Sequence, residues 1–238
     1  MPFHWHDDHL AAELPHGARA LFSTRRGGVS TGPFASLNLG RTTAEGDGDD
    51  PAAIAENRTR LAAAAGVAEL NLTRQVHATA IATDDAALDE ADGRVTARAG
   101  MAATVLVADC LPVAIAGPGA VAMLHAGWRG LAGGILRRGA ELVRAHGDGE
   151  LHAAIGPGIG VCCFEVGDEV REAFAEHAGA RRGRNLDLKR IARRELLDAG
   201  VSVVDDCELC TMCEPELFFS HRRDGAATGR QAGVAWRS

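Results

Sequence analysis

The sequence predicts a mixed α/β sandwich, and three observations support this fold class. Three runs in the middle of the chain are almost continuously apolar, which is typical of central strands covered on both faces; they span residues 103–108, 111–116 and 120–125. Segments with helical periodicity flank these runs, without the strict strand–helix alternation of a parallel sheet. The chain has 238 residues, of which 46% are hydrophobic, so it can bury a large core.

The N-terminal part is predicted to contain a strand, an acidic loop and a helix, in that order. A strand-like run covers residues 18–24 and leads into a loop rich in arginine and glycine. The acidic run at residues 45–50 is interpreted as a solvated loop. Because Asp50 followed by Pro51 is typical of a helix N-cap with proline in the first turn, we expect a helix over residues 51–65.

The C-terminal half is predicted to mix helices and strands. A helix is expected from about residue 130 to 145, followed by a strand over residues 151–155 and a glycine-rich loop. The remaining elements are two helices, at about residues 168–177 and 187–199, and two strands, at residues 201–204 and 229–236. Since no domain boundary is evident, we expect a single domain over residues 1–238.

Charge and hydropathy exclude several classes of protein. The formal net charge is −7, whereas nucleic-acid binding needs a basic excess. No run approaches 18 apolar residues, so neither a transmembrane helix nor a membrane partner is expected. The N-terminus lacks the basic-then-apolar order of a signal peptide, which predicts a cytoplasmic protein. No protein partner is evident, and the absence of tyrosine excludes a tyrosine general acid.

Three residues of metal-binding type are expected at strand ends, where a scaffold can present ligands to a cleft: His77, Cys110 and His125. Two imidazoles and a thiolate make a zinc set with an open fourth position. The same residues suit a mononuclear copper site, with Met123 on the strand face of His125. They also suit a Cys–His hydrolase in which Cys110 is the nucleophile. Two structural histidines and a buried thiol remain a further alternative.

Three loops combine arginine with glycine, and they contain Arg25, Arg129 and Arg222. Arg129 follows His125 at a strand-to-helix turn, where free backbone amides and a guanidinium can bind an anion. Each loop alone is typical of a solvated surface. Together, in an acidic chain, they predict an anionic small-molecule substrate.

The other cysteines carry a weaker signal. Cys207, Cys210 and Cys213 have the spacing of part of a ferredoxin run, but the fourth cysteine and its proline are not in place, so no iron–sulfur cluster is expected. The pair Cys162-Cys163 is interpreted as buried, although either thiol is a candidate fourth ligand of a closed structural zinc site. The histidines at positions 4, 6 and 9 are assigned to a frayed terminus.

A series of motifs resembles one family in order and spacing over nearly the whole chain. The chain resembles the laccase-domain family, which carries the label multicopper polyphenol oxidase and includes the mammalian laccase-domain purine enzyme. The matching segments are residues 22–30, Ser36–Gly40, Gln75–His77, Ala108–Pro112, His125–Gly130, Gly156–Ile159, Phe164–Gly167 and Phe218–Asp224.

The resemblance implies a four-layer α/β/β/α sandwich with mixed sheets and one catalytic domain over residues 1–238. It implies Zn²⁺, with copper as the alternative, bound by His77, Cys110 and His125. The implied activity is purine nucleoside phosphorylase, converting adenosine, inosine or methylthioadenosine and phosphate into free base and ribose 1-phosphate, together with adenosine deaminase activity.

The resemblance also suggests roles for site residues. Arg25 matches a loop arginine that the family needs for activity, and we expect Arg25 and Arg129 to position phosphate. Asp109, next to Cys110, is expected either to move protons or to orient the site. Asn38 and Arg222 are expected to bind substrate. Two departures are mild: Phe164 stands where tyrosine is usual, and Ala78 where glycine is common.

Two other activities remain as alternatives. A copper-dependent polyphenol oxidase is one, although a multicopper site needs repeated His-x-His pairs. The chain has 10 histidines, and only His4-Trp5-His6 has that form. The second is a Cys/His or zinc hydrolase that edits peptidoglycan precursors, a role also assigned to bacterial relatives.

Overall fold

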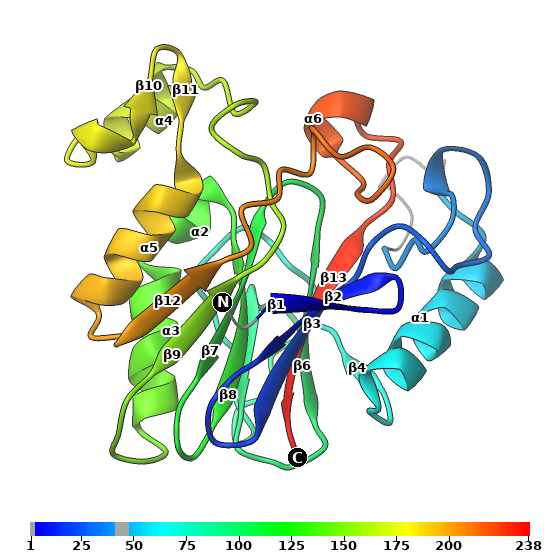
Figure 1. Ribbon diagram of the computed structural model, residues 1–238, viewed down its shortest axis with the longest axis horizontal. Helices are drawn as coiled ribbons and strands as arrows, with labels where there is room; N and C mark the ends of the chain where they lie inside the picture. The colour runs from blue at the N-terminus through cyan, green and yellow to red at the C-terminus, as the bar shows by residue number, and fades with distance from the viewer. Residues whose placement is uncertain (1–2, 41–47) are drawn as a thin grey trace.

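Two β-sheets lie face to face in the computed structural model, and helices cover the outer face of each (Figure 1). The structure describes residues 3–40 and 48–238, so residues 45–47 of the acidic run lie outside the described part. The implied four-layer α/β/β/α sandwich with mixed sheets is therefore confirmed. Among the described residues, no helix has the length and apolar character needed to cross a membrane.

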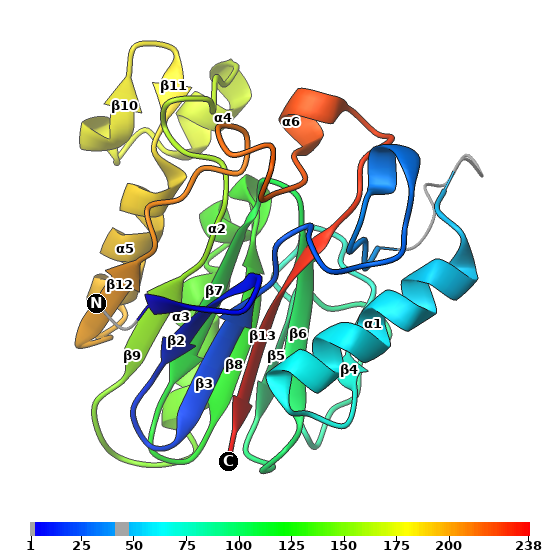
Figure 2. The ribbon, with the colours of Figure 1, turned by 45° about the vertical axis from the view of Figure 1, so that its right-hand side comes forward.

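Sheet I has six strands in the order β1-β2-β3-β13-β6-β4. All neighbours are antiparallel except β4 and β6. Its outer face packs against helix α1 (Pro51–Ala65), which begins after the N-cap Asp50 and ends at the left-handed Gly66, as predicted (Figure 2). The strands are β1 Phe3–His6, β2 His9–Glu13, β3 Ala18–Phe22, β4 Leu70–Asn71, β6 Ala102–Val107 and β13 Gln231–Arg237.

Sheet II has five strands in the order β12-β9-β7-β8-β5, with β12 and β9 parallel. Its outer face is covered by α2 (Trp128–Ala132), α3 (Ile135–Arg144) and α5 (Leu188–Asp198). The strands are β5 Gly93–Thr96, β7 Leu111–Ala116, β8 Val121–Ala126, β9 His152–Ile155 and β12 Val203–Asp206. The smaller elements are α4 Asp168–Ala173, the ribbon β10 Arg181–Arg182 with β11 Asn185–Leu186, and α6 His221–Asp224; two 3-10 turns lie at Gly32–Phe34 and Ala178–Ala180.

Alternation along the central strands directs side chains into two different cores. In β8, Leu124 packs against the helices, whereas Met123 packs between the two sheets. Since side chains alternate along a strand, His125 shares the inward face of Met123. The apolar runs of the sequence thus follow from burial on both faces, and they place His125 at one end of the layer between the sheets.

Three expectations need correction. The helix expected over residues 130–145 is two helices, because Gly134 adopts a left-handed conformation (φ 83°) between them. His77 lies in an irregular loop between β4 and β5 and not at a strand end. The N-terminal histidines are not frayed: β1 and β2 form a hairpin, and the buried His9 accepts a hydrogen bond from the Thr24 amide (3.4 Å).

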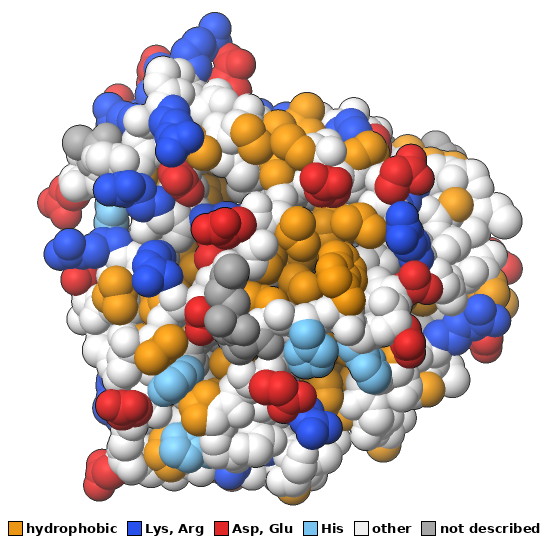
Figure 3. Space-filling view, in the orientation of Figure 1, with side chains coloured by type: hydrophobic (Ala, Val, Ile, Leu, Met, Phe, Trp, Pro, Cys, Tyr) orange, Lys and Arg blue, Asp and Glu red, His pale blue; other side chains and the backbone are white. Residues whose placement is uncertain are grey.

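Arginine side chains gather over β10, β11 and α5 on the face shown in Figure 3, interspersed with acidic groups. Several are paired locally, including Arg171 with Asp168 and Arg194 with Asp198. This surface therefore has mixed charge and is not a purely basic patch.

Candidate active site

A cleft of about 950 Å³ opens where the chain passes from one sheet to the other, and this cleft is the candidate active site. His77, Cys110 and His125 all line it. Apolar side chains from the end of β6 and from neighbouring loops form much of the wall; they are Leu72, Leu88, Leu106, Val107, Ile159 and Phe164. The cleft thus combines metal-binding side chains with an apolar surface.

The three predicted metal ligands meet in one group. Their ligand atoms lie within 4.8 Å of one another, and Cys110 Sγ is 3.9 Å from His77 Nε2. The rings of His77 and His125 are 4.7 Å apart between centroids and meet edge to face. His125 is buried, Cys110 half-buried and His77 exposed, so the group faces the cleft from its inner wall.

Asp92, which the sequence analysis missed, holds this group together. Its carboxylate accepts a hydrogen bond from His125 Nδ1 (2.8 Å) and from the amides of His77 (2.9 Å) and Ala78 (2.8 Å). A third amide, of Val76, also donates to it (3.1 Å). These bonds stabilise the left-handed conformation of His77 (φ 59°). No sequence signal marked Asp92, because Asp-Gly ahead of a strand is also typical of an ordinary turn.

Ionisation within the group favours a metal ligand or a reactive thiolate. Burial opposes the charge on Cys110, but the charges and hydrogen bonds of His125 and His77 lower its pKa to about 6. Burial likewise opposes the charge on His125, yet Cys110 and Asp92 raise its pKa to about 9. Hydrogen bonds from His125 and from the backbone of Ala78 and Val76 lower the pKa of Asp92 despite its burial. Because Asp92 holds Nδ1–H of His125, Nε2 is left for a metal.

Gly127 leaves the space into which the ligand atoms face. A Cβ at this position would lie 3.0 Å from Cys110 Sγ, 3.1 Å from His77 Cδ2 and 3.8 Å from His125 Nε2. The φ of Gly127 is −69°, so its backbone does not require glycine. The missing side chain therefore serves the ligand group, and the residues present fit a metal with two nitrogen ligands and one sulfur ligand.

The predicted arginines occupy different places. Arg222 lines the cleft, where it lies 5.3 Å from the Phe164 ring centroid and donates to the Glu165 carbonyl (2.8 Å). Arg25 donates to the carbonyls of Ala35 (2.8 Å) and Pro215 (3.0 Å) and is not among the cleft-lining residues.

Arg129 also lies outside the cleft lining. Its exposed side chain stacks on Trp128 (4.1 Å) and pairs with Glu169 (3.5 Å). Helix α2, which was expected to supply free amides for an anion, has only five residues.

Asp109 and Asn38 each accept a hydrogen bond from the backbone amide of an arginine that lines the cleft. Asp109 lines the cleft in a left-handed conformation (φ 93°). Its two carboxylate oxygens accept from Thr211 Oγ1 (2.6 Å) and from the Arg222 amide (2.7 Å). Asn38 is buried, and its Oδ1 accepts from the Arg230 amide (2.8 Å). Both side chains therefore orient arginines of the cleft.

Two further arginines line the cleft and were not predicted as site residues. Arg58, on α1, donates through Nε and Nη2 to the Leu39 carbonyl (3.0 and 2.7 Å). Arg230 donates through Nη1 to the carbonyls of Thr228 and Gly229 (both 2.9 Å). Burial lowers the pKa of Arg230, while Cys110 and Asp109 act in the opposite direction. The position of Arg230 shortly after the loop of Arg222 could have marked it in the sequence, whereas Arg58 resembles any surface residue of a helix.

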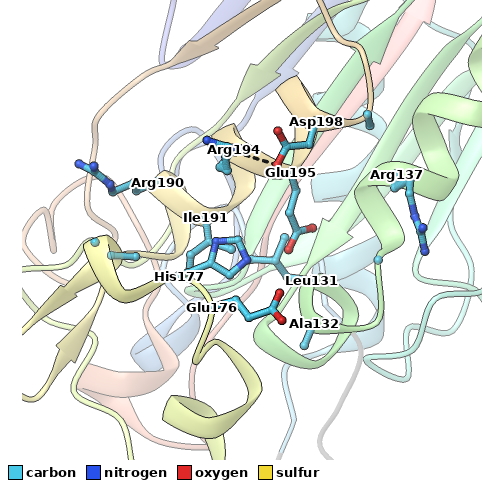
Figure 4. Close-up of a pocket in the computed structure, with 14 residues that line it drawn as sticks. Leu131, Ala132, Arg137, Glu176, His177, Arg190, Ile191, Arg194, Glu195 and Asp198 are labelled. Carbon is cyan, nitrogen blue, oxygen red and sulfur yellow. Dashed lines mark hydrogen bonds and ion pairs between the residues drawn. The ribbon is translucent and has the colours of Figure 1, made fainter.

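A second cavity, of about 630 Å³, lies between α2, α3 and α5 (Figure 4). Its charged lining residues have both signs, and Arg194 pairs with Asp198 within it (2.7 Å). None of the residues that line it belongs to the predicted site. The geometry therefore favours the cleft with His77, Cys110 and His125.

Comparisons with known proteins agree with the resemblance seen in the motifs. The chain is 41% identical over 234 residues to "Purine nucleoside phosphorylase PA4543" of Pseudomonas aeruginosa, which covers 93% of this chain and 94% of that protein. The crystal structure of protein YfiH from Bacillus licheniformis matches with a TM-score of 0.90 at 31% identity, over 100% of this chain and 99% of that one. Neisseria meningitidis protein NMB0706 matches with a TM-score of 0.87 at 36% identity, over 98% and 100% of the two chains.

The family model described as "Multi-copper polyphenol oxidoreductase laccase" matches residues 19–238. This match covers both sheets except for the N-terminal hairpin, and it includes every residue of the candidate site. The chain belongs to the multi-copper polyphenol oxidoreductase laccase family.

Proposed function

We propose that this protein is a zinc-dependent purine nucleoside phosphorylase with adenosine deaminase activity. One observation carries the proposal: His77, Cys110 and His125 form a three-ligand group on the wall of a cleft that also presents Arg58, Arg222 and Arg230. The name of the Pseudomonas aeruginosa relative supports the phosphorylase part of this proposal. We assign it to one catalytic domain over residues 1–238.

His77, Cys110 and His125 would bind the zinc, and Asp92 would fix the ring of His125. Bound zinc would supply Lewis-acid polarisation at its open position. The thiolate character of Cys110 suits this role, since a thiolate is the form that ligates metal. The six cysteines are all free thiols, as expected for a reducing compartment, which supports a cytoplasmic enzyme.

Phosphorolysis needs an apolar surface for the purine and cations for phosphate. Phosphate attacks the anomeric carbon of ribose, a carbon–oxygen bond forms, and the bond to the purine nitrogen breaks. The free base and ribose 1-phosphate are the products. Leu106, Val107 and Phe164 would hold the base, while the cleft arginines would bind phosphate through paired donors. Adenosine, inosine and methylthioadenosine are the proposed nucleosides.

The predicted residues take specific roles in this scheme. Asp109 and Asn38 act as positioning residues, because their hydrogen bonds hold the backbone amides of Arg222 and Arg230. Direct substrate binding by Asn38 stays a prediction, since its side chain is buried and is not part of the cleft lining. Arg222 binds substrate directly. Arg25 and Arg129 stay predictions based on the resemblance: each must leave its present partners to reach phosphate in the cleft.

The test is a product assay with purified protein of measured zinc content. Adenosine is incubated with and without phosphate, and the purines are separated by chromatography. We expect adenine only when phosphate is present, and inosine from deamination in either case. Cys110→Ser should lose both products, whereas Cys207→Ser, a thiol change outside the cleft, should keep them. Absence of any purine product from folded, zinc-loaded protein would contradict the proposal.

A second candidate is a Cys–His hydrolase, because Cys110 has a pKa of about 6 beside His125 and His77. In that case tightly bound zinc would block the nucleophile. Metal removal separates the two: chelation abolishes activity in the zinc enzyme and increases it in the thiol hydrolase.

Copper-dependent oxidation of a phenol by the same protein loaded with copper would favour the copper alternative.

A further inference from the structure

Four cysteines form a second group outside the cleft, which we call the cysteine cluster: Cys162, Cys163, Cys210 and Cys213. Their sulfur atoms lie within 4.8 Å of one another, and all four are free thiols. None of them lines the cleft. The expectation that Cys162 and Cys163 are buried is wrong, since Cys162 is exposed and Cys163 half-buried.

Two turns far apart in sequence bring the thiols together. The first turn carries Cys162 and Cys163, and the Gly160 carbonyl accepts from the Cys163 amide (3.0 Å). The second carries Cys210 and Cys213, with the Glu214 amide bonded to the Cys210 carbonyl (3.2 Å). A β-bridge between Gly158 and Cys210 joins the two segments. The arrangement is therefore built by backbone hydrogen bonds and not by chance proximity of flexible side chains.

Gly160 lies against the sulfur atoms of Cys162 and Cys210. Its amide donates to Cys210 Sγ (3.2 Å). A Cβ at Gly160 would lie 3.1 Å from Cys162 Sγ and 3.4 Å from Cys210 Sγ. An amide hydrogen bond to sulfur stabilises a metal-bound thiolate, and the missing side chain leaves room for the sulfurs to converge. Both features favour a ligand set over four unrelated thiols.

We propose that the cysteine cluster binds one Zn²⁺ ion through four thiolates, as a structural site separate from the three-ligand group. A Zn–S bond of about 2.3 Å in a tetrahedron places sulfurs about 3.8 Å apart. Cys213 Sγ is 3.5 Å from Cys162 Sγ and 3.4 Å from Cys163 Sγ, close to that spacing. Each thiol releases its proton to solvent on binding.

The number and spacing of the ligands set the type of site. Four protein ligands leave no open position, which is typical of structural and not catalytic zinc. In an iron–sulfur cluster the four thiolates are distributed over two or four irons, so as a set they stand further apart than four thiolates that share one ion. The compact group therefore favours a single ion. Cys210 and Cys213 have the two-residue spacing common in zinc sites, and the adjacent pair Cys162-Cys163 completes the set.

This zinc would fix two loops that border the cleft. Phe164, which lines the cleft, follows Cys163 directly. Thr211, between Cys210 and Cys213, donates from Oγ1 to Asp109 in the cleft (2.6 Å). Both segments lack regular helix or strand, so a metal is a direct way to order them. The cysteine cluster would thus position cleft residues without touching substrate.

The test measures metal in a background without the three-ligand site. Full-length Cys110→Ser protein is purified anaerobically, dialysed against metal-free buffer and analysed by mass spectrometry for zinc. We expect one zinc per chain in Cys110→Ser, and one when Cys207→Ser is added as the matched thiol control. Adding Cys162→Ser and Cys213→Ser together should remove that zinc. Equal zinc in all these proteins, or iron with cluster absorption, would overturn the proposal.

Cobalt gives a second readout if the variant with both cluster substitutions does not fold. Folded Cys110→Ser protein is stripped with a chelator and titrated with Co²⁺. Strong thiolate-to-cobalt charge transfer with the visible bands of a tetrahedral four-sulfur site is the expected result. Weak spectra without thiolate bands, or a disulfide from Cys213 to Cys162 or Cys163 in the anaerobic protein, would overturn the proposal. Neither readout depends on phosphorylase activity.

Discussion

Asp92 joins the loop of His77 to the strand of His125 through a single carboxylate. Its Oδ1 accepts from His125 Nδ1 and from the His77 amide, and its Oδ2 accepts from the amides of Val76 and Ala78. The carboxylate oxygens thus accept four hydrogen bonds, three of them from the backbone of residues 76–78. The position of His77 therefore depends on Asp92. Replacing one of its acceptor oxygens should therefore weaken metal binding before it affects any substrate contact.

The variant Asp92→Asn tests this dependence. An amide has one oxygen, so its NH₂ group would face backbone donors and release the loop at residues 76–78. We expect metal affinity at the three-ligand site to fall about 10- to 100-fold, measured by competition with a chromophoric chelator. The control is Asp89→Asn, an exposed acid on the same cleft. Equal loss in both variants would mean that charge, and not orientation, is responsible.

Gly127→Ala tests the space beside the ligands. Its Cβ would lie 3.0 Å from Cys110 Sγ, although the φ of −69° accommodates alanine. We expect weaker zinc binding and lower activity, with little change in melting temperature. Gly167→Ala is the matched control, because Gly167 also precedes a helix, has a φ of −79° and has nothing within 4 Å of its Cβ position. Normal zinc binding by Gly127→Ala would exclude a steric role.

The sequence predicts the three metal ligands but not the residues that hold them in position. His77, Cys110 and His125 are recognisable by residue type and by motif. Asp92 and Gly127 are not, because their roles depend on contacts between segments that the chain brings together only on folding. The same limit applies to the cysteine cluster, in which Cys163 and Cys213 are 50 residues apart.

Among the elements, α5 carries a half-buried acid, Glu195, whose ionisation opposes folding. Burial raises the pKa of Glu195 to about 7, and Asp198 adds to the shift while Arg137 opposes it. The folded state therefore binds a proton that the unfolded state, with an ordinary value of 4.5, has already released. The resulting destabilisation is absent when the pH is below 4.5, the pKa of the unfolded state. It grows as the pH rises toward about 7, the pKa of the folded state, and reaches its full size above that pH.

Glu195→Gln should remove this pH-dependent term. We expect the melting temperatures of variant and wild type to coincide near pH 4.5, and the variant to melt on the order of a few degrees higher at pH 8. Thermal unfolding followed by circular dichroism at several pH values measures the difference. Glu141→Gln, an exposed acid on α3, controls for the loss of surface charge. A constant offset at all pH values would mean that titration of Glu195 is not the cause.

The elements themselves follow the local sequence where the signals agree. Helix α1 has the predicted bounds because the Asp50 cap, Pro51 and the final glycine all point to the same ends. Strand β7 also has its predicted bounds, since its whole length is buried. The prediction of one helix over residues 130–145 was wrong. The apolar periodicity continues across Gly133 and Gly134, but the left-handed backbone of Gly134 interrupts the helix there.

In the whole molecule, the ligands lie where the chain passes between the two sheets. The loop of His77 connects β4 of sheet I to β5 of sheet II, and Cys110 lies in the connection from β6 to β7. His125 lies near the end of β8 and faces the layer between the sheets. A metal bound by all three residues therefore ties the two sheets together at one end, so metal binding should stabilise the whole fold.

Zinc titration of the stripped protein tests this coupling. A ligand that binds only the folded state adds about 2.7 kcal/mol at 100 times its dissociation constant. We expect zinc to raise the melting temperature of wild type and of Cys207→Ser equally, and to raise that of Cys110→Ser by less. The cysteine cluster contributes the same amount to all three proteins, so the difference reports the three-ligand site alone. An equal rise in the melting temperatures of Cys110→Ser and wild type would contradict this prediction. In that case zinc binding by His77, Cys110 and His125 would add no stability to the whole fold.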